Sequence, residues 1–143
     1  MIIPGKINTK YTSPKFHHFG YATYDIKVTE DFFKELGFIE DSDLIKDDLL
    51  GVFIKFYKFD KSEIKLELVA PIDVLNSPIK SVLSRRPGLY HLAFLSSNFA
   101  QTAKKCSLSA ITESKPAVAF DGRHVQFFVS KDSSIIELIY GKD

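Results

Sequence analysis

Two short segments alternate between apolar and polar side chains around a glutamate, which is the pattern of a half-buried β-strand. In Ile64–Pro71 (IKLELVAP) the isoleucine and both leucines point to one face, whereas Glu67 points to the other. Ser134–Tyr140 (SIIELIY) repeats this arrangement around Glu137. A carboxylate is costly to bury among apolar neighbours without a partner. The pattern therefore predicts two strands, each with a glutamate that needs a metal or another cation.

Helical spacing of apolar residues predicts two helices, and a third short one follows from capping residues. The first helix lies in DIKVTEDFFKELGF, where Asp25 caps the start and Gly37 suits a left-handed end. Asn98 caps a second helix in FAQTAKKCSLS. Ser77 and Pro78 fit the N-cap and the first helical position of a short helix, SPIKSVLS.

The remaining apolar runs predict strands, and their order along the chain is repeated. They lie at 16–23, 38–39, 52–59, 63–70, 89–95, 110–112, 118–120, 125–129 and 134–140. The order strand, helix, several strands thus occurs twice, which indicates an internal repeat in a mixed α+β fold. We expect an N-terminal arm at 1–15 and one domain at 16–143. That domain divides into module one at 16–71, a linker helix at 72–87 and module two at 88–140.

The repeat places a histidine and a glutamate at matched positions of each half. His18 opens HFGYAT and His91 opens HLAFLS, 73 positions later, while Glu67 and Glu137 are 70 positions apart. A single strand histidine is more often structural, and a single strand glutamate usually faces water. Two matched pairs together favour metal ligation, because two imidazoles and two carboxylates suit a divalent cation. His17, beside the first histidine, is interpreted as a solvent or packing residue.

Composition narrows the classes of partner. The 143 residues suit one domain, and the formal net charge of +1 gives no indication of nucleic-acid binding. No apolar run approaches membrane-spanning length, so no membrane partner is expected. Cys106 is the single cysteine, which excludes an internal disulfide and suits a reducing compartment. We therefore expect a cytoplasmic protein with a small-molecule partner; dimerisation through sheet edges or the arm is compatible with the pattern.

At these residues the chain resembles the vicinal oxygen chelate superfamily, and within it the methylmalonyl-CoA epimerases. The resemblance covers roughly residues 16–140 and rests on HHFGYAT…FFKELGF, IKLELVAP…SPIKSVL, GLYHLAF and GRHVQFFVSKDSSIIELI. It implies two tandem βαβββ modules that form a curved mixed sheet with a central metal cleft. In that resemblance His18, Glu67, His91 and Glu137 match the ligands of a divalent metal ion, which could be Co, Mn, Ni, Zn or Mg.

The resemblance also implies an activity, with one departure. The epimerases use two carboxylates to move the substrate proton, and alignment of GVFIKFY puts Ile54 where one of them stands. Glu137 remains as a catalytic base, with Glu67 as the second candidate. We expect a metal-dependent isomerase that enolises an acyl thioester, such as an acyl-CoA, or a related 2-oxo substrate. The alternatives are a glyoxalase-like lyase, an extradiol dioxygenase and a non-catalytic ligand-binding protein like the bleomycin-resistance proteins.

Several other residues have both a functional and a structural interpretation. The hydroxyl groups of Tyr57 and Tyr90 are candidates to polarise a substrate or donate a proton to it, although tyrosines on strands more often serve in side-chain packing. Basic residues near the predicted cleft are able to hold a substrate carboxylate or phosphate, although surface charge is the simpler interpretation. These are Arg85, Arg86, Lys115, Arg123 and His124.

Overall fold

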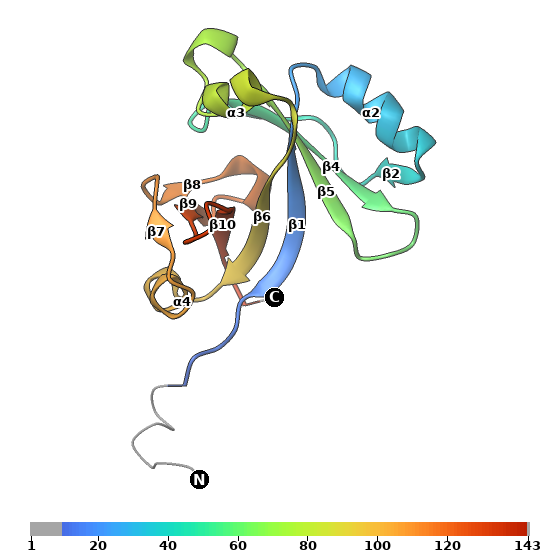
Figure 1. Ribbon diagram of the computed structural model, residues 1–143. Coiled ribbons are helices and arrows are strands. Elements are labelled where there is room, and N and C mark those ends of the chain that lie inside the picture. The colour runs from blue at the N-terminus through green and yellow to red at the C-terminus, as the bar shows by residue number, and fades with distance from the viewer. Residues whose placement is uncertain (1–9, 143) are drawn as a thin grey trace.

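The structure of the protein is a computed structural model that describes residues 10–142 (Figure 1). Residues 1–9 of the expected arm lie outside the described residues, and Lys15 already belongs to the first strand. Module one contains β1 (Lys15–Ala22), α2 (Ile26–Glu35), β2 (Phe38–Glu40), β3 (Ile45–Asp47), β4 (Val52–Phe59) and β5 (Lys65–Pro71). The short helices η1 (Val74–Asn76) and α3 (Lys80–Arg85) connect it to module two. Module two contains β6 (Gly88–Ser96), α4 (Phe99–Lys105), β7 (Ser109–Ala110), β8 (Lys115–Pro116), η2 (Val118–Phe120), β9 (His124–Val129) and β10 (Ile135–Tyr140).

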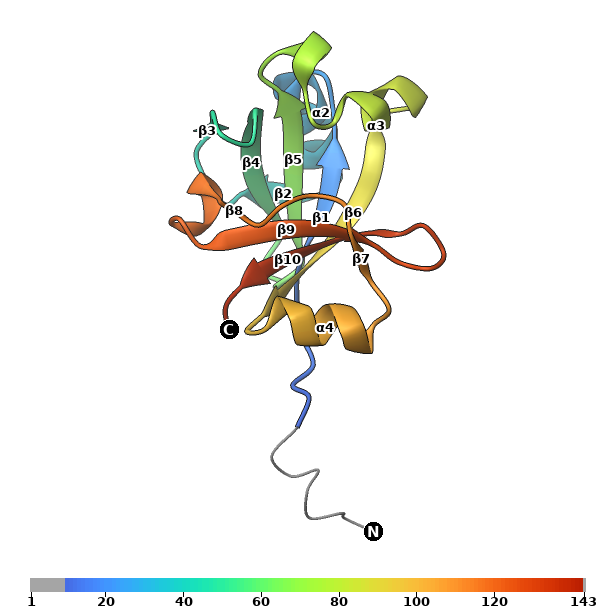
Figure 2. The same cartoon turned by 90° about the vertical axis from the view of Figure 1, so that its left-hand side faces the viewer.

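The strands of both modules join in one curved mixed sheet, as the repeat predicts. The strand order is β2-β4-β5-β1-β6-β10-β9-β7, with β3 on β4 and β8 on β9. The first strands of the modules, β1 and β6, pair antiparallel at the centre, and each pairs parallel with the last strand of its own module. Figure 2 shows β9 and β10 crossing in front of the module-one strands. The expected α+β fold is therefore confirmed.

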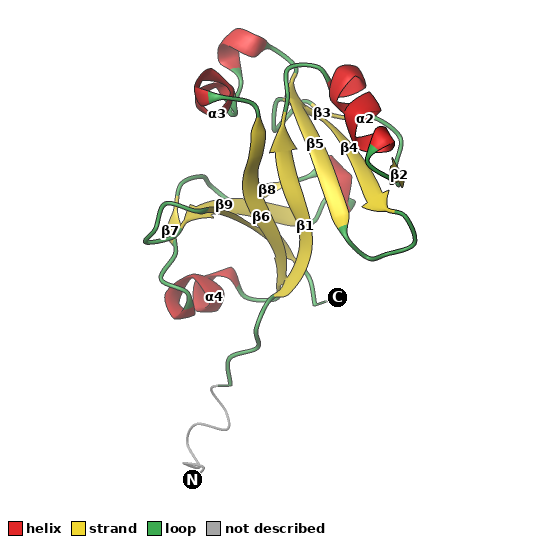
Figure 3. Cartoon of the chain, turned by 45° about the vertical axis from the view of Figure 1, so that its right-hand side comes forward, coloured by secondary structure: helices red, strands yellow, loops and turns green. Residues whose placement is uncertain are grey.

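Helices α2 and α4 lie on the outside of the curved sheet (Figure 3), whereas α3, at the end of the strands, contributes Leu83 to the buried cluster that contains Ile54 and Val69. On module one, Phe33 of α2 packs with Tyr57, Leu66 and Leu68. The leucines of β5 therefore point under the helix, and Glu67 between them points to the concave side, because neighbouring strand residues face opposite ways. Within residues 10–142, no helix is long and apolar enough to cross a membrane.

Local capping signals are confirmed at two helices and corrected at the third. The Asp25 side chain accepts hydrogen bonds from the amides of Lys27 and Val28 at the start of α2, and Gly37 follows its end at φ +107°. Asn98 caps α4 as predicted. Helix α3, however, begins at Lys80 rather than at Ser77–Pro78. The Ser77 hydroxyl accepts a hydrogen bond from the Ile79 amide and so closes a turn that precedes the helix. Serine side chains stabilise such turns as well as helix N-termini, so the same residue type fits both structures.

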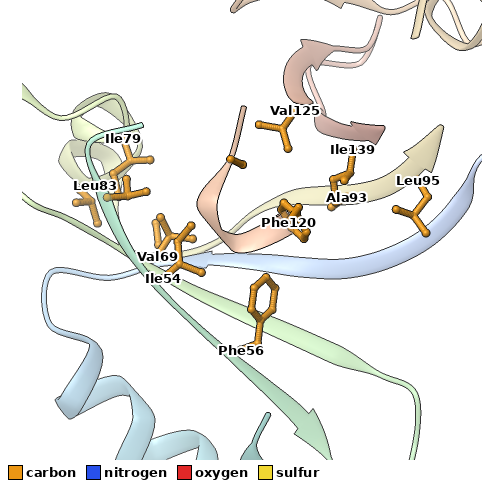
Figure 4. Close-up of a cluster of buried hydrophobic side chains, with 13 residues drawn as sticks. Ile54, Phe56, Val69, Ile79, Leu83, Ala93, Leu95, Phe120, Val125 and Ile139 are labelled. Carbon is orange, nitrogen blue, oxygen red and sulfur yellow. The ribbon is translucent and has the colours of Figure 1, made fainter. Parts of the chain in front are cut away.

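The predicted strand at 118–120 is wrong, because this segment is the 3₁₀ turn η2. Asp121 follows it in the left-handed conformation, at φ 55°, and the Phe120 amide donates to the Ala117 carbonyl. The turn carries Phe120 into a buried cluster between the two modules, where it lies among Ile54, Phe56 and Val69 on one side and residues of module two on the other (Figure 4). Part of the concave face is thus filled by core.

A buried aspartate connects η2 to module one. Asp47, at the end of β3, has no exposed surface. One of its carboxylate oxygens accepts the Val118 amide at 2.9 Å, and the other accepts the Leu50 amide at 3.0 Å. Hydrogen bonds to a charged acceptor are stronger than neutral ones, so this contact holds η2 against the first module.

Candidate metal and active site

Four side chains converge on the concave face at the seam of the two modules. His18 lies on β1, Glu67 on β5, His91 on β6 and Glu137 on β10. These are the four adjacent strands at the centre of the sheet, in the order β5-β1-β6-β10. The histidines therefore occupy the middle and the glutamates flank them. All four are buried, with exposed fractions of 0 to 4%.

The distances among the four side chains match a single small cation. The Nε2 atoms of His18 and His91 are 3.2 Å apart. The His18 Nε2 lies 3.3 Å from the Oε1 of each glutamate, and the His91 Nε2 lies 3.4 Å from Glu67 Oε1 and 3.2 Å from Glu137 Oε1. Two atoms bound to one ion at ~2.1 Å are themselves about 3.0–3.4 Å apart at octahedral or tetrahedral angles. The spacing thus leaves an ion within bonding reach of all four.

The hydrogen bonding at the cluster also fits a cation. Among the residues that the structure describes, the buried Glu137 Oε1 has no hydrogen-bond partner of good geometry, although both Nε2 atoms are close. A buried oxygen without a partner is costly, and a bound cation would remove that cost. Imidazole and carboxylate donors together suit divalent transition metals as well as zinc. The residues present therefore fit the group that the sequence pattern predicts.

The four groups also shift one another's protonation. Burial raises the pKa of Glu67 and of Glu137, but the nearby histidines outweigh it and lower both values. Burial likewise opposes the charged form of His18, yet the two glutamates raise its pKa to about 9. The carboxylates are accordingly ionised across the physiological range. A divalent cation would bind in competition with the protons on the imidazoles.

His17 has a role that the sequence interpretation missed. The register between β1 and β6 shifts between Phe16 and His18, so a bulge leaves His17 unpaired. A bulge re-aims a side chain, and here the Nδ1 atoms of His17 and His18 are 2.8 Å apart. Burial, together with the neighbouring His18 charge, lowers the pKa of His17 to about 4, so this imidazole is neutral. The neutral His17 imidazole accepts a hydrogen bond from Nδ1 of His18. This contact orients the His18 ring so that its Nε2 faces the cluster.

Gly20 is a second residue that the sequence interpretation missed. It pairs with His91 across the β1–β6 ladder, and a Cβ at this position would meet the His91 ring at 2.0 Å. A glycine inside a strand often marks a close approach of another group, and this signal was present in HFGYAT. Because Gly20 has no side chain, the His91 imidazole can occupy the space directly above it.

The cluster opens on a cavity of about 170 Å³ between the modules. Glu67 and Glu137 line it together with Ile54, Val69 and Phe120. Ile54 is 5% exposed, so the position that the resemblance assigns to a second acid/base is an apolar wall. The aromatic rings of Phe56 and Phe120 pack near His18, at ring-centre distances of 5.4 and 6.1 Å. Such walls exclude water and strengthen electrostatic interactions at the site.

Tyr57 and Tyr90, the two tyrosines considered for a functional role, lie in different surroundings. Tyr57 donates its hydroxyl to Glu30 Oε1 at 2.8 Å in the cluster beneath α2, so it is structural. Tyr90 sits where the β1–β6 register skips a residue, and it lines both the 170 Å³ cavity and a neighbouring groove of about 440 Å³. Burial, and the charges of Glu67 and Glu137, raise the pKa of Tyr90 well above its usual value. Tyr90 therefore presents a neutral hydroxyl beside the cluster.

The basic residues separate into two groups. Arg85 and Arg86 line the 440 Å³ groove, next to Tyr90 and His91. Arg123, by contrast, donates to the carbonyls of Phe120 and Tyr140. His124 Nδ1 lies 2.7 Å from Ser114 Oγ, and Lys115 belongs to β8. Neither cavity is lined by these last three residues, which supports their interpretation as structural or surface groups.

Comparison with known proteins places this geometry in a family. Residues 17–127 match the model of the Glyoxalase/Bleomycin resistance protein/Dioxygenase superfamily. The protein belongs to this superfamily. Its members typically use a divalent metal, in keeping with the His/Glu cluster. A sequence search of curated proteins gave no match.

Solved structures support the fold assignment. A hypothetical protein from Bacillus halodurans C-125 is 26% identical, with a TM-score of 0.76 over 92% of this chain and 97% of that chain. Methylmalonyl-CoA epimerase from Mycobacterium tuberculosis is 24% identical, with a TM-score of 0.72 over 90% and 89%. A single-residue variant of the Streptomyces coelicolor methylmalonyl-CoA epimerase, in complex with 2-nitronate-propionyl-CoA, is 19% identical, with a TM-score of 0.74 over 92% and 100%. At 24% and 19% identity, the similarity to the two epimerases establishes the fold alone.

Proposed function

We propose that the protein is a metal-dependent isomerase of methylmalonyl-CoA epimerase type, which enolises an acyl thioester or a related 2-oxo substrate. The observation that carries this proposal is the buried cluster of two imidazoles and two carboxylates, within 4.8 Å of one another, at the wall of a cavity. His18, Glu67, His91 and Glu137 would hold the ion. Cobalt, manganese, nickel, zinc and magnesium are all compatible with this donor set.

The ion, when bound, supplies Lewis-acid polarisation of the substrate carbonyl, which acidifies the neighbouring C–H bond. The chain's own carboxylates would then move the proton. Glu137 accepts it, the C–H electron pair moves into the new carbon–carbon double bond, and the carbonyl oxygen takes the negative charge. Return of a proton to the opposite face inverts the carbon. Glu67 is the group for that step, because its strand lies on the other side of the two histidine strands.

The surroundings of the cluster support a thioester with an anionic tail. Arg85 and Arg86 line the groove that shares Val82, Tyr90 and Ile135 with the inner cavity. Guanidinium groups pair well with phosphate, so an acyl-CoA would place its acyl end near the cluster and its phosphates at the arginines. The neutral Tyr90 hydroxyl between the two cavities is positioned to donate a hydrogen bond to the substrate.

One observation favours a second candidate, a ligand-binding protein like the bleomycin-resistance proteins. Ile54 makes the wall of the cavity apolar where the resemblance assigns a catalytic carboxylate. A cavity that buries an apolar ligand needs no ion. A glyoxalase-like lyase would use the same four ligands, and it differs from an isomerase in its product.

Metal content distinguishes these candidates first. Purified protein reconstituted with cobalt is expected to retain about one ion per chain, measured by elemental analysis after dialysis. The variant combining His91→Ala and Glu137→Ala should lose it, because two of the four donors are gone. His124→Ala is the matched control, since this histidine is on the surface beside Ser114, and it should keep the ion. Parent protein without a bound ion would overturn the enzyme proposal.

Proton exchange then tests the chemistry. In deuterated buffer, 2-methylmalonyl-CoA is expected to gain deuterium at the α-carbon when the reconstituted protein is present, as followed by mass spectrometry. Glu137→Gln should slow this exchange by about 100-fold or more, in the range of a lost general base. Ile54→Glu should accelerate it if Ile54 stands where the second carboxylate belongs. Protein that binds the ion but exchanges no α-proton of 2-methylmalonyl-CoA would point to another thioester or 2-oxo acid as the substrate.

A further inference from the structure

We propose that the 170 Å³ cavity is an acyl pocket for an apolar group of about six carbons, so that the preferred ligand is a medium-chain acyl thioester. This inference rests on the proposed function, because it assigns a substrate class to the same site. It concerns the part of the ligand that extends from the reacting carbon into the protein.

The chemistry of the walls supports an apolar occupant. Leu50, Val52, Ile54, Val69 and Ile79 contribute to the lining, from β4, β5 and the connections beside them. Among the described residues (10–142) that line the cavity, Glu67 and Glu137 are the only charged ones, and both are negative. Within that part of the chain, no lysine or arginine lines the cavity to pair with an acidic substituent. A charged group placed among the apolar walls, away from the His/Glu cluster and its ion, would lose its hydration without compensation.

The size of the cavity sets the size of the group. An apolar cavity of about 150 Å³ holds one benzene molecule, which has six carbons. At about 170 Å³ this cavity accommodates a group of the same size. A three-carbon acyl group would leave much of the wall without contacts and would forfeit the corresponding dispersion energy.

The walls of the cavity are also pre-formed in the absence of a ligand. Val52, Ile54, Val69 and Ile79 are each 3 to 6% exposed and belong to the buried cluster drawn in Figure 4. Interiors of this kind are close-packed and yield little. The pocket consequently discriminates by length, since it is unable to collapse onto a short chain or to expand around a long one.

Calorimetric titration of the cobalt-reconstituted protein with propionyl-CoA, hexanoyl-CoA and dodecanoyl-CoA tests the proposal. Hexanoyl-CoA is expected to bind about 50-fold more tightly than propionyl-CoA, which corresponds to three methylenes at ~0.8 kcal/mol each. Dodecanoyl-CoA should bind no more tightly than hexanoyl-CoA, because six further carbons have no room. Equal dissociation constants for propionyl-CoA and hexanoyl-CoA would overturn the acyl pocket, and so would affinity that rises steadily to dodecanoyl-CoA.

Substitutions of Val69 locate the effect. Val69→Phe fills the cavity and should reduce the preference for hexanoyl-CoA over propionyl-CoA to less than fivefold. Val69→Ala enlarges it and should move the optimum toward dodecanoyl-CoA, so the test does not depend on the larger variant folding. Ile39→Phe is the matched control, because Ile39 is 53% exposed on β2 outside the cavity, and it should leave the series unchanged. An unchanged preference in both Val69 variants would place the acyl group elsewhere.

The outcomes separate this inference from the proposed function. A length preference with no α-proton exchange in either 2-methylmalonyl-CoA or hexanoyl-CoA would keep the acyl pocket and refute the isomerase. Exchange of 2-methylmalonyl-CoA without any length preference would keep the isomerase and refute the acyl pocket.

Discussion

Replacement of Gly20 by alanine should expel one candidate metal ligand while leaving the backbone in place. The new Cβ would lie 2.0 Å from His91 Cε1 and 2.4 Å from His91 Nε2. Ordinary contact begins at 3.4 Å, so the ring must move by about 1.4 Å. Gly20 is not among the residues with positive φ, and alanine is therefore compatible with the strand at this position.

The displacement is large compared with the tolerance of a metal bond. Ligand distances in metal sites hold to within about 0.2 Å, so His91 Nε2 would leave the coordination sphere. Changing a residue that merely orients a ligand weakens metal binding by about 10- to 100-fold, and the loss of the ligand itself should reach the upper end or exceed it. The expected effect is a dissociation constant for cobalt at least 100-fold higher, or ~2.7 kcal/mol.

Cobalt titration by calorimetry measures this change, and circular dichroism confirms that the variant is folded. The double variant Gly20→Ala with His91→Ala should bind cobalt no more weakly than His91→Ala alone, because the alanine acts only through the imidazole. Cobalt affinity in Gly20→Ala within threefold of the parent would refute the reasoning. Additive losses in the double variant would show that Gly20 acts by another route.

Three further predictions concern neighbouring contacts. His17→Phe should weaken cobalt binding by about 10- to 100-fold, and His17→Asn, which keeps an acceptor near His18, should restore most of it; equal losses in both would exclude the positioning role. Glu30, whose pKa falls from its usual 4.5 to about 2 because Lys55 and a tyrosine hydroxyl outweigh its burial, should contribute stability above pH 4.5 and lose it as the pH falls toward 2. Acid unfolding of Glu30→Gln should lack this phase, and an unchanged profile would contradict the assignment. Asp47→Ala should lower the free energy of unfolding in urea by about 2–4 kcal/mol, because the Val118 amide loses a charged acceptor, and a loss under 0.5 kcal/mol would show that the connection contributes little.

In helix α2, the spacing of apolar residues predicts the helix but not which of its side chains are buried. Helical spacing identifies the segment, and Asp25 and Gly37 mark its ends. However, Val28 and Phe32 are 67% and 56% exposed, whereas the charged Glu30 is buried. The carboxylate of Glu30 bonds the Lys55 ammonium at 2.6 Å. Residues distant in sequence therefore decide which face of the helix is covered.

Local patterns were enough to predict most of the elements, the repeat and the four matched histidines and glutamates. These follow from short-range rules, because strand alternation has a period of two and caps act within a few residues. The same patterns also indicated the family, which the match over residues 17–127 confirms.

How these residues meet depends on the folded arrangement of the two modules. The turn that inserts Phe120 is held by the hydrogen bond from the Val118 amide to Asp47 of module one. The bulges at His17 and Tyr90 and the close approach of Gly20 to His91 depend on the register between β1 and β6, which belong to different modules. So does the cavity, whose size depends on packing between segments far apart in the chain. The physical reason is that a side chain's direction is encoded locally, whereas the group that it faces is set by long-range pairing and close packing.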